Sequence, residues 1–188
     1  TIKININNFN YEIISMGHRN SQGMYVDNKN GFIIQTEHGP RGGDEINIIE
    51  IEKIDNKKIL NYGWPISSYG DHYSSTSPGQ IEKKSSEKYK KYPLHKSHAK
   101  YGFIEPLKYF FPSIGISEIT KIGNNKYVLG SLRDGSLYFF EINNKKLSNL
   151  KRVGVGERVR DINIKNNKLY LFLEDTASIG IINLNWDN

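Results

Sequence analysis

Short apolar stretches alternate with polar turns along most of the chain, and this pattern predicts an all-β fold. Several stretches are separated by clusters of Asn, Lys and Gly, which are typical of tight turns between antiparallel strands. Helical periodicity is almost absent, so we expect no helical layer. The predicted strands are Tyr11–Ser15, Met24–Asp27, Phe32–Thr36, Ile46–Ile51, Ile119–Ile122, Tyr127–Ser131, Leu137–Ile142, Val159–Ile164, Leu169–Glu174 and Ile179–Leu184.

The predicted strands recur as a unit: a strand, an Asn-rich turn, a second strand, a loop and an outer strand. Two equivalent turns, at Asn125 and Asn167, lie about 40 residues apart, which is the length of one four-stranded propeller blade. A β-sandwich is the alternative all-β architecture, and the repeat favours a β-propeller. We therefore expect residues 1–188 to form a single β-propeller segment of about three blades.

An open arc of blades would leave one sheet face and its unpaired neighbours exposed, which makes a protein prone to aggregate. We therefore expect further blades to complete the ring. The sequence leaves their source open between a separate chain, a removed segment and a symmetry mate.

The segment near residues 67–100 interrupts the repeat and predicts an inserted surface loop. Its first part is rich in Ser, Gly and Tyr, and residues 81–92 are highly charged. A loop this long is either functional or a solvated excursion, and both interpretations remain open. His95 and His98 have the spacing of metal ligands on a helical turn, but the spacing of the chain fixes no third ligand.

Composition removes several classes of function. The chain carries 26 Lys and Arg against 20 Asp and Glu, a net charge of +6. This excess is mild, so nucleic-acid binding is not favoured, whereas an anionic ligand suits it. The absence of cysteine excludes a disulfide, a thiolate metal site and a cysteine nucleophile. No apolar run reaches the length of a membrane span.

A glycine-rich turn is the first candidate for chemistry. Gly39, Pro40, Gly42 and Gly43 require a sharp turn whose carbonyls are free to face something other than a strand. Two carboxylates, Asp44 and Glu45, follow at once. Carbonyl and carboxylate oxygens are the ligands that calcium prefers. A tight loop with solvated acids is the alternative, because this motif is weak by itself.

Further motifs add specificity to that turn. They are Gly17–Gly23 (GHRNSQG), Thr36–Asn47 (TEHGPRGGDEIN), Asn61–Pro65 (NYGWP), Gly130–Arg133 (GSLR) and Gly156–Asp161 (GERVRD). In this order they resemble the soluble quinoprotein sugar dehydrogenases, which depend on pyrroloquinoline quinone (PQQ) and calcium. The resemblance runs from about Gly17 to the C-terminus. It implies a six-bladed β-propeller of which this chain supplies roughly the C-terminal half.

The resemblance also implies roles for individual residues. The carbonyls of Gly39 and Pro40 match ligands of a cofactor-bound calcium. Glu45 and the Tyr62 carbonyl, with Asp44 as a further candidate, look like ligands of a second, structural calcium. The residues that match cofactor contacts are Arg19, Asn20, Arg133, Arg158 and Arg160.

Two of these arginines can also be judged from spacing. Arg158 and Arg160 are two apart in a strand pattern, so both side chains should lie on one face. A pair of surface arginines is the alternative. Arg133 stands where the family commonly has a lysine, and its larger fork can still bind a carboxylate.

The expected activity is oxidation of an aldose at its anomeric carbon, with electrons passed to an external acceptor. Such a reaction needs a base for the sugar hydroxyl. The family's catalytic histidine precedes the Gly17–Gly23 motif, so we expect the base outside this sequence and assign no catalytic residue. The resemblance alone implies a periplasmic or secreted protein.

Two other functions compete with the enzyme. One is a non-catalytic β-propeller module that binds a sugar or a protein partner, and the other is a structural fragment that completes a ring. The arginine set discriminates them, because a pure binding module does not need it.

Overall fold

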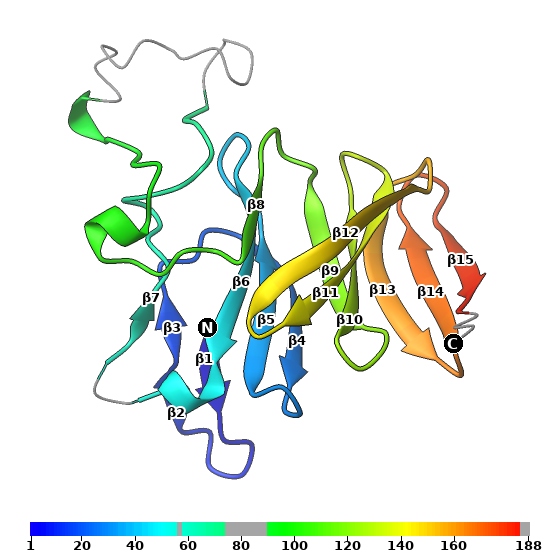
Figure 1. Cartoon of the computed structure of the whole chain (residues 1–188), viewed down its shortest axis with the longest axis horizontal. Helices are drawn as coiled ribbons and strands as arrows, with labels where there is room; N and C mark the ends of the chain where they lie inside the picture. The colour runs from blue at the N-terminus through cyan, green and yellow to red at the C-terminus, as the bar shows by residue number, and fades with distance from the viewer. Residues whose placement is uncertain (56–57, 74–89, 185–188) are drawn as a thin grey trace.

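The computed structural model describes residues 1–55, 58–73 and 90–184, and nearly all of its regular structure is strand (Figure 1). Two short 3₁₀ helices, η1 (Ile51–Lys53) and η2 (Ala99–Tyr101), accompany the strands. The strands are β1 (Ile2–Ile4), β2 (Tyr11–Ile13), β3 (Ser15–Met16), β4 (Ser21–Asp27), β5 (Phe32–Glu37), β6 (Asp44–Glu50), β7 (Leu60–Asn61), β8 (Lys108–Phe110), β9 (Ile116–Lys121), β10 (Lys126–Ser131), β11 (Ser136–Asn143), β12 (Lys146–Gly154), β13 (Val159–Lys165), β14 (Lys168–Leu173) and β15 (Ser178–Asn183).

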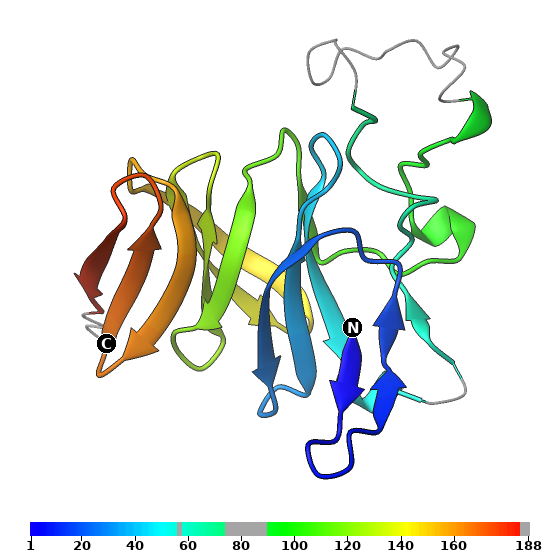
Figure 2. The ribbon, with the colours of Figure 1, turned by 180° about the vertical axis from the view of Figure 1, so that it is seen from behind.

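Three antiparallel sheets stand side by side in chain order (Figures 1 and 2). Their strand orders are β4-β5-β6-β8, β9-β10-β11-β12 and β13-β14-β15. The first strands of the sheets, β4, β9 and β13, are neighbours in space. This arrangement is typical of propeller blades around an axis. Two small sheets, β1-β2 and the parallel pair β3-β7, lie before the first large sheet along the ring.

The hydrophobic core lies between successive sheets. Ile34, Ile46, Ile119 and Leu129 are among the buried residues that join the first sheet to the second. A second cluster, which includes Val128 and Val159, joins the second sheet to the third, and a third cluster fills the space between the first sheet and β3-β7. Three large sheets therefore pack face to face in a row, as propeller blades do, whereas a sandwich has only two layers.

The all-β prediction is confirmed, but the described residues do not close a ring. Apolar side chains remain exposed at both ends of the row of sheets, among them Met24 and Val26 at one end and Ile179 and Ile181 at the other. No helix in the described part of the chain is long and apolar enough to cross a membrane.

Every predicted strand overlaps a strand of the structure, and four strands were not predicted. These are β1, β7, β8 and β12. All but one of the β12 positions are exposed, because β12 is the outermost strand of its sheet. An outermost strand that meets solvent on both faces carries no alternation of apolar and polar residues. Of the predicted loop at 67–100, residues 74–89 lie outside the described residues.

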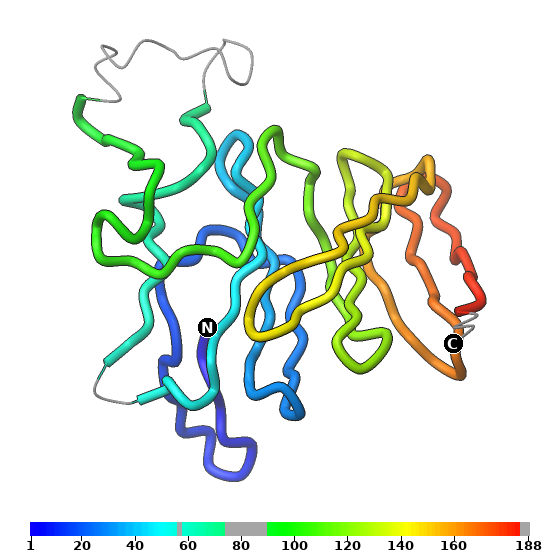
Figure 3. The backbone as a smooth tube through the Cα atoms, in the orientation of Figure 1, coloured from blue at the N-terminus to red at the C-terminus, as the bar shows by residue number. Residues whose placement is uncertain are grey.

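Strand register places the candidate motifs at one end of the sheets. The β5–β6 turn (38–43), the β8–β9 connection (111–115), the β10–β11 turn (132–135) and the β12–β13 connection (155–158) all lie at the upper end in Figures 1 and 3. We call this end the loop face. Ser21 pairs with Glu37, so the segment that leads into β4 reaches the same face.

Candidate functional site

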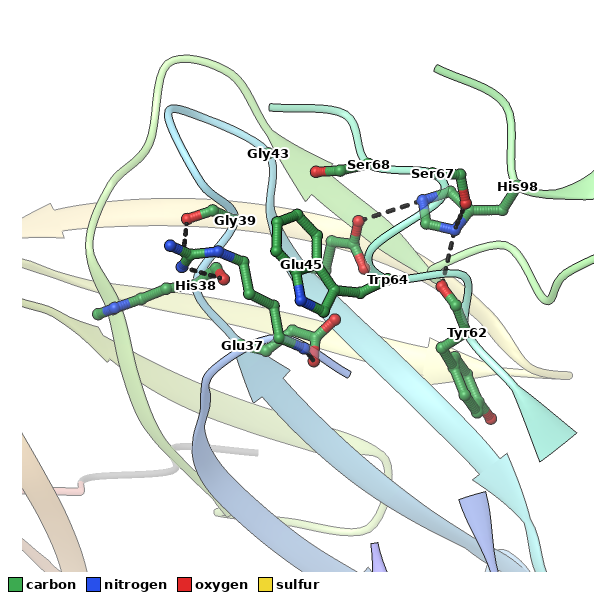
Figure 4. Close-up of a pocket in the computed structure, with 11 residues that line it drawn as sticks. Glu37, His38, Gly39, Gly43, Glu45, Tyr62, Trp64, Ser67, Ser68 and His98 are labelled. Atoms are coloured by element: carbon green, nitrogen blue, oxygen red, sulfur yellow. Dashed lines mark hydrogen bonds and ion pairs between the residues drawn. The ribbon is translucent and has the colours of Figure 1, made fainter. Parts of the chain in front are cut away.

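A small cavity lies beneath the β5–β6 turn, at the loop face of the first sheet (Figure 4). It encloses about 10 Å³, which is close to the room that one water molecule needs. Its lining comes from the segment before β4, the β5–β6 hairpin, the segment after β7 and the segment before η2. The lining residues are Arg19, Glu37, His38, Gly39, Gly43, Glu45, Tyr62, Trp64, Ser67, Ser68 and His98.

Glycine is required at the turn that roofs this cavity. Gly43 has φ of +68°, and a Cβ there would lie 2.1 Å from the backbone nitrogen of Gly70. Both the left-handed conformation and the close approach of a second chain segment exclude other residues. The glycines of this motif therefore allow the segment after β7 to lie directly against the turn.

Asp44 fixes the other side of the turn. Its carboxylate accepts hydrogen bonds from Ser113 Oγ at 2.6 Å and from the backbone nitrogens of Gly115 and Ile116 at 2.8 and 3.1 Å. It also accepts one from the Gly39 nitrogen at 3.3 Å. Both oxygens thus bind donors of the chain itself. Asp44 is fully buried, and it ties the turn to the β8–β9 connection without lining the cavity.

Arg19 lies across the mouth of the turn. Its Nη1 donates to the carbonyl oxygens of Gly39 at 2.9 Å and His38 at 3.1 Å (Figure 4). Its guanidinium carbon lies 5.3 Å from the centre of the Trp64 ring and 5.7 Å from that of Tyr73. Both distances suit a cation–π contact. Its Nε is buried and has no hydrogen-bond partner.

A row of buried polar groups begins beside Arg19. Glu37 Oε2 lies 3.2 Å from His18 Nδ1, and His18 Nε2 lies 2.8 Å from Ser15 Oγ. The order of groups is that of a serine hydrolase triad. Ser15, however, is 1% exposed, so no substrate reaches its hydroxyl. The row therefore positions Glu37, which also accepts the backbone N–H of Arg19 at 3.2 Å.

The row continues across the cavity to His98. Asn47 Nδ2 donates to Glu37 Oε1 and Glu45 Oε2, each at 3.3 Å. Glu45 Oε1 lies 3.3 Å from His98 Nε2, a close polar contact without the geometry of a hydrogen bond. Burial raises the pKa of Glu45 to about 7, against the opposing effect of His98. Burial alone would lower the pKa of His98, but the nearby Glu45 carboxylate raises it.

The structure brings some of the predicted site residues together. Arg19, Gly39, Glu45 and Tyr62 all line the cavity, and Pro40 is buried next to it in the turn. Asn20 is exposed at the start of β4, where its carbonyl accepts the backbone N–H of His38. The motifs Gly17–Gly23, Thr36–Asn47 and Asn61–Pro65 thus meet in one small site.

The other predicted arginines lie at the loop face but outside the cavity. Arg133 is exposed in the β10–β11 turn. Arg158 Nη2 lies 3.5 Å from Glu174, and Arg160 Nη2 lies 2.7 Å from the same carboxylate. Their shared partner agrees with the predicted common face. Glu174 supplies the negative charge that holds this pair in the structure.

Several lining residues were not predicted, and Glu37 and His98 matter most among them. Glu37 carried a signal, because it is an acid at the end of an apolar strand that is buried throughout. The sequence pairs His98 with His95 as candidate metal ligands. In the structure His95 stacks on Tyr101, with the ring centroids 3.7 Å apart. In the described part of the chain no group of three or more His, Cys, Asp or Glu residues could hold a metal ion.

Known proteins resemble this chain over most of its length. Residues 3–183 match the family described as Glucose / Sorbosone dehydrogenase. The chain is 30% identical over 176 residues to the aldose sugar dehydrogenase YliI of Escherichia coli (strain K12). The aligned residues cover 89% of this chain and 42% of that protein.

Solved structures show the same fold. The soluble aldose sugar dehydrogenase (Asd) from Escherichia coli in the apo-form has a TM-score of 0.65 and 25% identity, covering 89% of this chain and 46% of that one. The PQQ-bound aldose sugar dehydrogenase (Adh) from Streptomyces coelicolor has a TM-score of 0.55 at 20% identity, covering 87% and 40%, and its likeness concerns the fold alone. The chain thus spans less than half the length of these relatives. Because the family match covers nearly the whole of it, this chain belongs to the glucose/sorbosone dehydrogenase family of quinoprotein sugar dehydrogenases.

Proposed function

We propose that this chain provides the cofactor-binding face of a PQQ- and calcium-dependent dehydrogenase that oxidises aldose sugars at the anomeric carbon. The observation that carries the proposal is the placement of Arg19 at the loop face. Its guanidinium lies near two aromatic rings and against the Gly39 carbonyl, and its buried Nε has no hydrogen-bond partner.

The surroundings of Arg19 suit a planar, anionic, aromatic ligand. A guanidinium offers several donors in one plane and pairs strongly with anionic oxygens. Trp64 is half-buried and Tyr73 is exposed, so ring surface is available beside those donors. PQQ is a planar quinone with three carboxylates, and these features match both parts of the site.

The Gly39 carbonyl fits the role of a cation ligand as well. It accepts one hydrogen bond from Arg19, and a carbonyl oxygen has a second lone pair. We assign it, with the Pro40 carbonyl, to the calcium that would accompany the cofactor. When bound together, PQQ and calcium would supply a polarised quinone that accepts hydride from the sugar.

The remaining arginines would add positive charge to the same face. Arg133 and Arg158 lie in its connections and Arg160 lies at the start of β13, and concentrated charge there attracts an anion. Arg158 and Arg160 share Glu174, and Arg158 Nε also lies 4.0 Å from Asp175. Asn20 is exposed beside Arg19, where its side chain can also reach a ligand.

We further propose that the chain forms about three blades of a six-bladed propeller and that other blades cover its open ends. They would come from a second chain or from another part of the same protein. Exposed Val26 and Ile179 at opposite ends support this, because open apolar sheet faces favour burial. Those blades would also supply the base for the sugar hydroxyl. A location outside the cytoplasm and an external electron acceptor belong to the same proposal.

The second candidate is a propeller module that binds a sugar or a protein without catalysis. The observation that favours it is the ion pairing of Arg158 and Arg160 with Glu174, which gives these arginines a structural role without any cofactor.

Calorimetric titration of PQQ into the purified chain tests the first candidate against the second. We expect binding in calcium, weaker binding in chelator, and loss of binding in Arg19→Ala. Arg152→Ala is the matched control, because Arg152 lies on the outermost strand β12 and pairs with Asp134. Binding that survives in Arg19→Ala would contradict the proposed site, and a sugar that binds the chain without PQQ would favour the non-catalytic module.

A further inference from the structure

We propose that the imidazole of His98, in place of a metal ion, joins Glu45 to the main-chain carbonyl of Tyr62, and that this link positions Trp64 beside Arg19. The His98 side chain is 2% exposed and the Glu45 side chain 5%. His98 Nδ1 lies 2.8 Å from the Tyr62 oxygen, and Nε2 lies 3.3 Å from Glu45 Oε1 (Figure 4). The two ring nitrogens therefore face two different oxygens.

These are the oxygens that the family resemblance assigns to a structural calcium. Calcium takes six to eight oxygen ligands at about 2.3–2.6 Å. Here the imidazole ring lies between the carboxylate and the carbonyl, and the adjoining cavity encloses only about 10 Å³. The third candidate ligand, Asp44, binds Ser113, Gly115 and Ile116. The residues present do not fit this ion.

An imidazole can perform the same mechanical task. Nδ1 lies within hydrogen-bond distance of the buried Tyr62 carbonyl, and Nε2 makes a close polar contact with the buried Glu45 carboxylate. Ser67 Oγ, 3.0 Å from Nδ1, shares the carbonyl end of the ring. The link joins β6 to the segment after β7, as an ion between Glu45 and Tyr62 would, and it also holds the end of the predicted loop, where His98 lies.

The same ring supports the aromatic wall of the site. A Cβ at Gly63, next to Trp64, would lie 2.6 Å from His98 Nδ1, so this backbone packs directly on the imidazole. Tyr69 packs on the His98 ring with centroids 5.2 Å apart. The Ser67 nitrogen donates to the Gly63 carbonyl and closes the turn around Trp64. His98 is therefore a positioning residue for the ring that lies beside Arg19.

Thermal unfolding of the chain without PQQ tests the first half of the proposal. We expect the wild-type melting temperature to be the same in calcium and in chelator. His98→Ala should melt at a lower temperature, and free imidazole should restore part of the loss. His95→Ala is the matched control, since that ring stacks on Tyr101 outside the cavity. A chelator-induced fall in wild type that disappears in Glu45→Gln would overturn the proposal.

Terbium luminescence gives a second test that does not need a folded His98 variant. Tyr62 and Trp64 line the cavity and would sensitise a lanthanide bound there. We expect no terbium signal that depends on Glu45 in the wild-type chain. A wild-type signal that is lost in Glu45→Gln would place a metal ion where we place the imidazole.

The positioning role is tested by the fluorescence of Trp64. The chain has two tryptophans, so Trp186→Phe leaves Trp64 as the only one. In that background His98→Gln should shift the emission maximum, and His95→Gln should leave it unchanged. Unchanged emission in His98→Gln would remove the positioning role. All three readouts are independent of PQQ, so failure of cofactor binding would leave this inference standing.

Discussion

The guanidinium of Arg19 donates a 2.9 Å hydrogen bond to the carbonyl oxygen of Gly39. This contact joins the two motifs that carry the candidate site, one before β4 and the other between β5 and β6. A cationic side chain thus already lies at the carbonyl that we assign to the cofactor's calcium. The second lone pair of that carbonyl is the one left for the cation.

Arg19→Lys tests the geometry of that contact separately from its charge. Lysine keeps the positive charge but loses the planar guanidinium, whose Nη1 donates to two carbonyls while Nη2 donates to the Tyr73 hydroxyl at 3.3 Å. We expect PQQ affinity to fall by about 1.5–3 kcal/mol, the usual scale for hydrogen bonds to charged groups. Calorimetry of the variant beside Arg152→Ala checks this. Equal affinity in Arg19→Lys and wild type would show that only the charge matters.

Glu174 sets the availability of two further arginines. Arg158→Ala should weaken PQQ binding by about 1.5–3 kcal/mol. Glu174→Gln should strengthen binding instead, because it removes the carboxylate that both arginines share and leaves Arg158 with the longer contact to Asp175 at 4.0 Å. The same titration measures both variants at low and moderate salt. Two variants that both match the wild type would restrict these arginines to a structural role.

Asp27 should make stability depend on pH. Burial alone would raise its pKa, but hydrogen bonds from Lys121 and Tyr127 outweigh burial and lower the pKa. A pKa that is lower in the folded chain adds stability above the unfolded value of about 4, and this contribution is lost as pH falls through the folded value. Asp27→Asn should therefore cost about 1–3 kcal/mol at neutral pH and progressively less in acid.

Urea unfolding across that pH range measures the Asp27 effect. Glu12→Gln is the control, because the Glu12 pair with Lys3 is exposed and long at 3.9 Å. A cost in Asp27→Asn that stays constant with pH would contradict the assignment.

Gly43→Ala should destabilise the roof of the cavity. A matched variant, Gly31→Ala, has nearly the same φ of +72° but meets nothing within 4 Å of the added Cβ. Gly31→Ala should cost about 1 kcal/mol for the left-handed backbone alone. Gly43→Ala should cost clearly more, since its Cβ would lie 2.1 Å from the Gly70 nitrogen. Chemical denaturation compares the two, and equal losses would deny the close approach.

The inner strands could be predicted from the sequence because buried strands are rich in apolar residues. All six positions of β5 are buried, and its apolar run predicts a strand without any tertiary information. β12 has no such apolar run, since eight of its nine positions are exposed to solvent. The outermost strand of a sheet carries polar residues, and so do loops. A polar stretch therefore does not distinguish a strand from a loop.

The residues of the candidate site also differ in whether a local sequence pattern can reveal them. Arg19, Gly39 and Glu45 stand in compact motifs, so a local pattern is enough to propose them. His98 lies in the predicted loop, far from Glu45 in the sequence, and meets it only in the folded chain. No periodicity relates the two positions. The buried role of Glu37 likewise depends on His18 and Asn47, which come from different segments. Contacts between distant segments need the fold before they can be recognised.

The link between Glu45 and His98 also has a consequence for biosynthesis. The ribosome delivers β6 well before it delivers the segment that contains His98. During that interval the β5–β6 hairpin carries the Glu45 carboxylate without the His98 imidazole that lies beside it in the folded chain. A nascent chain arrested before His98 would therefore present an unfinished hairpin to chaperones and proteases. The cavity can therefore be completed only after the segment that contains His98 has been synthesised.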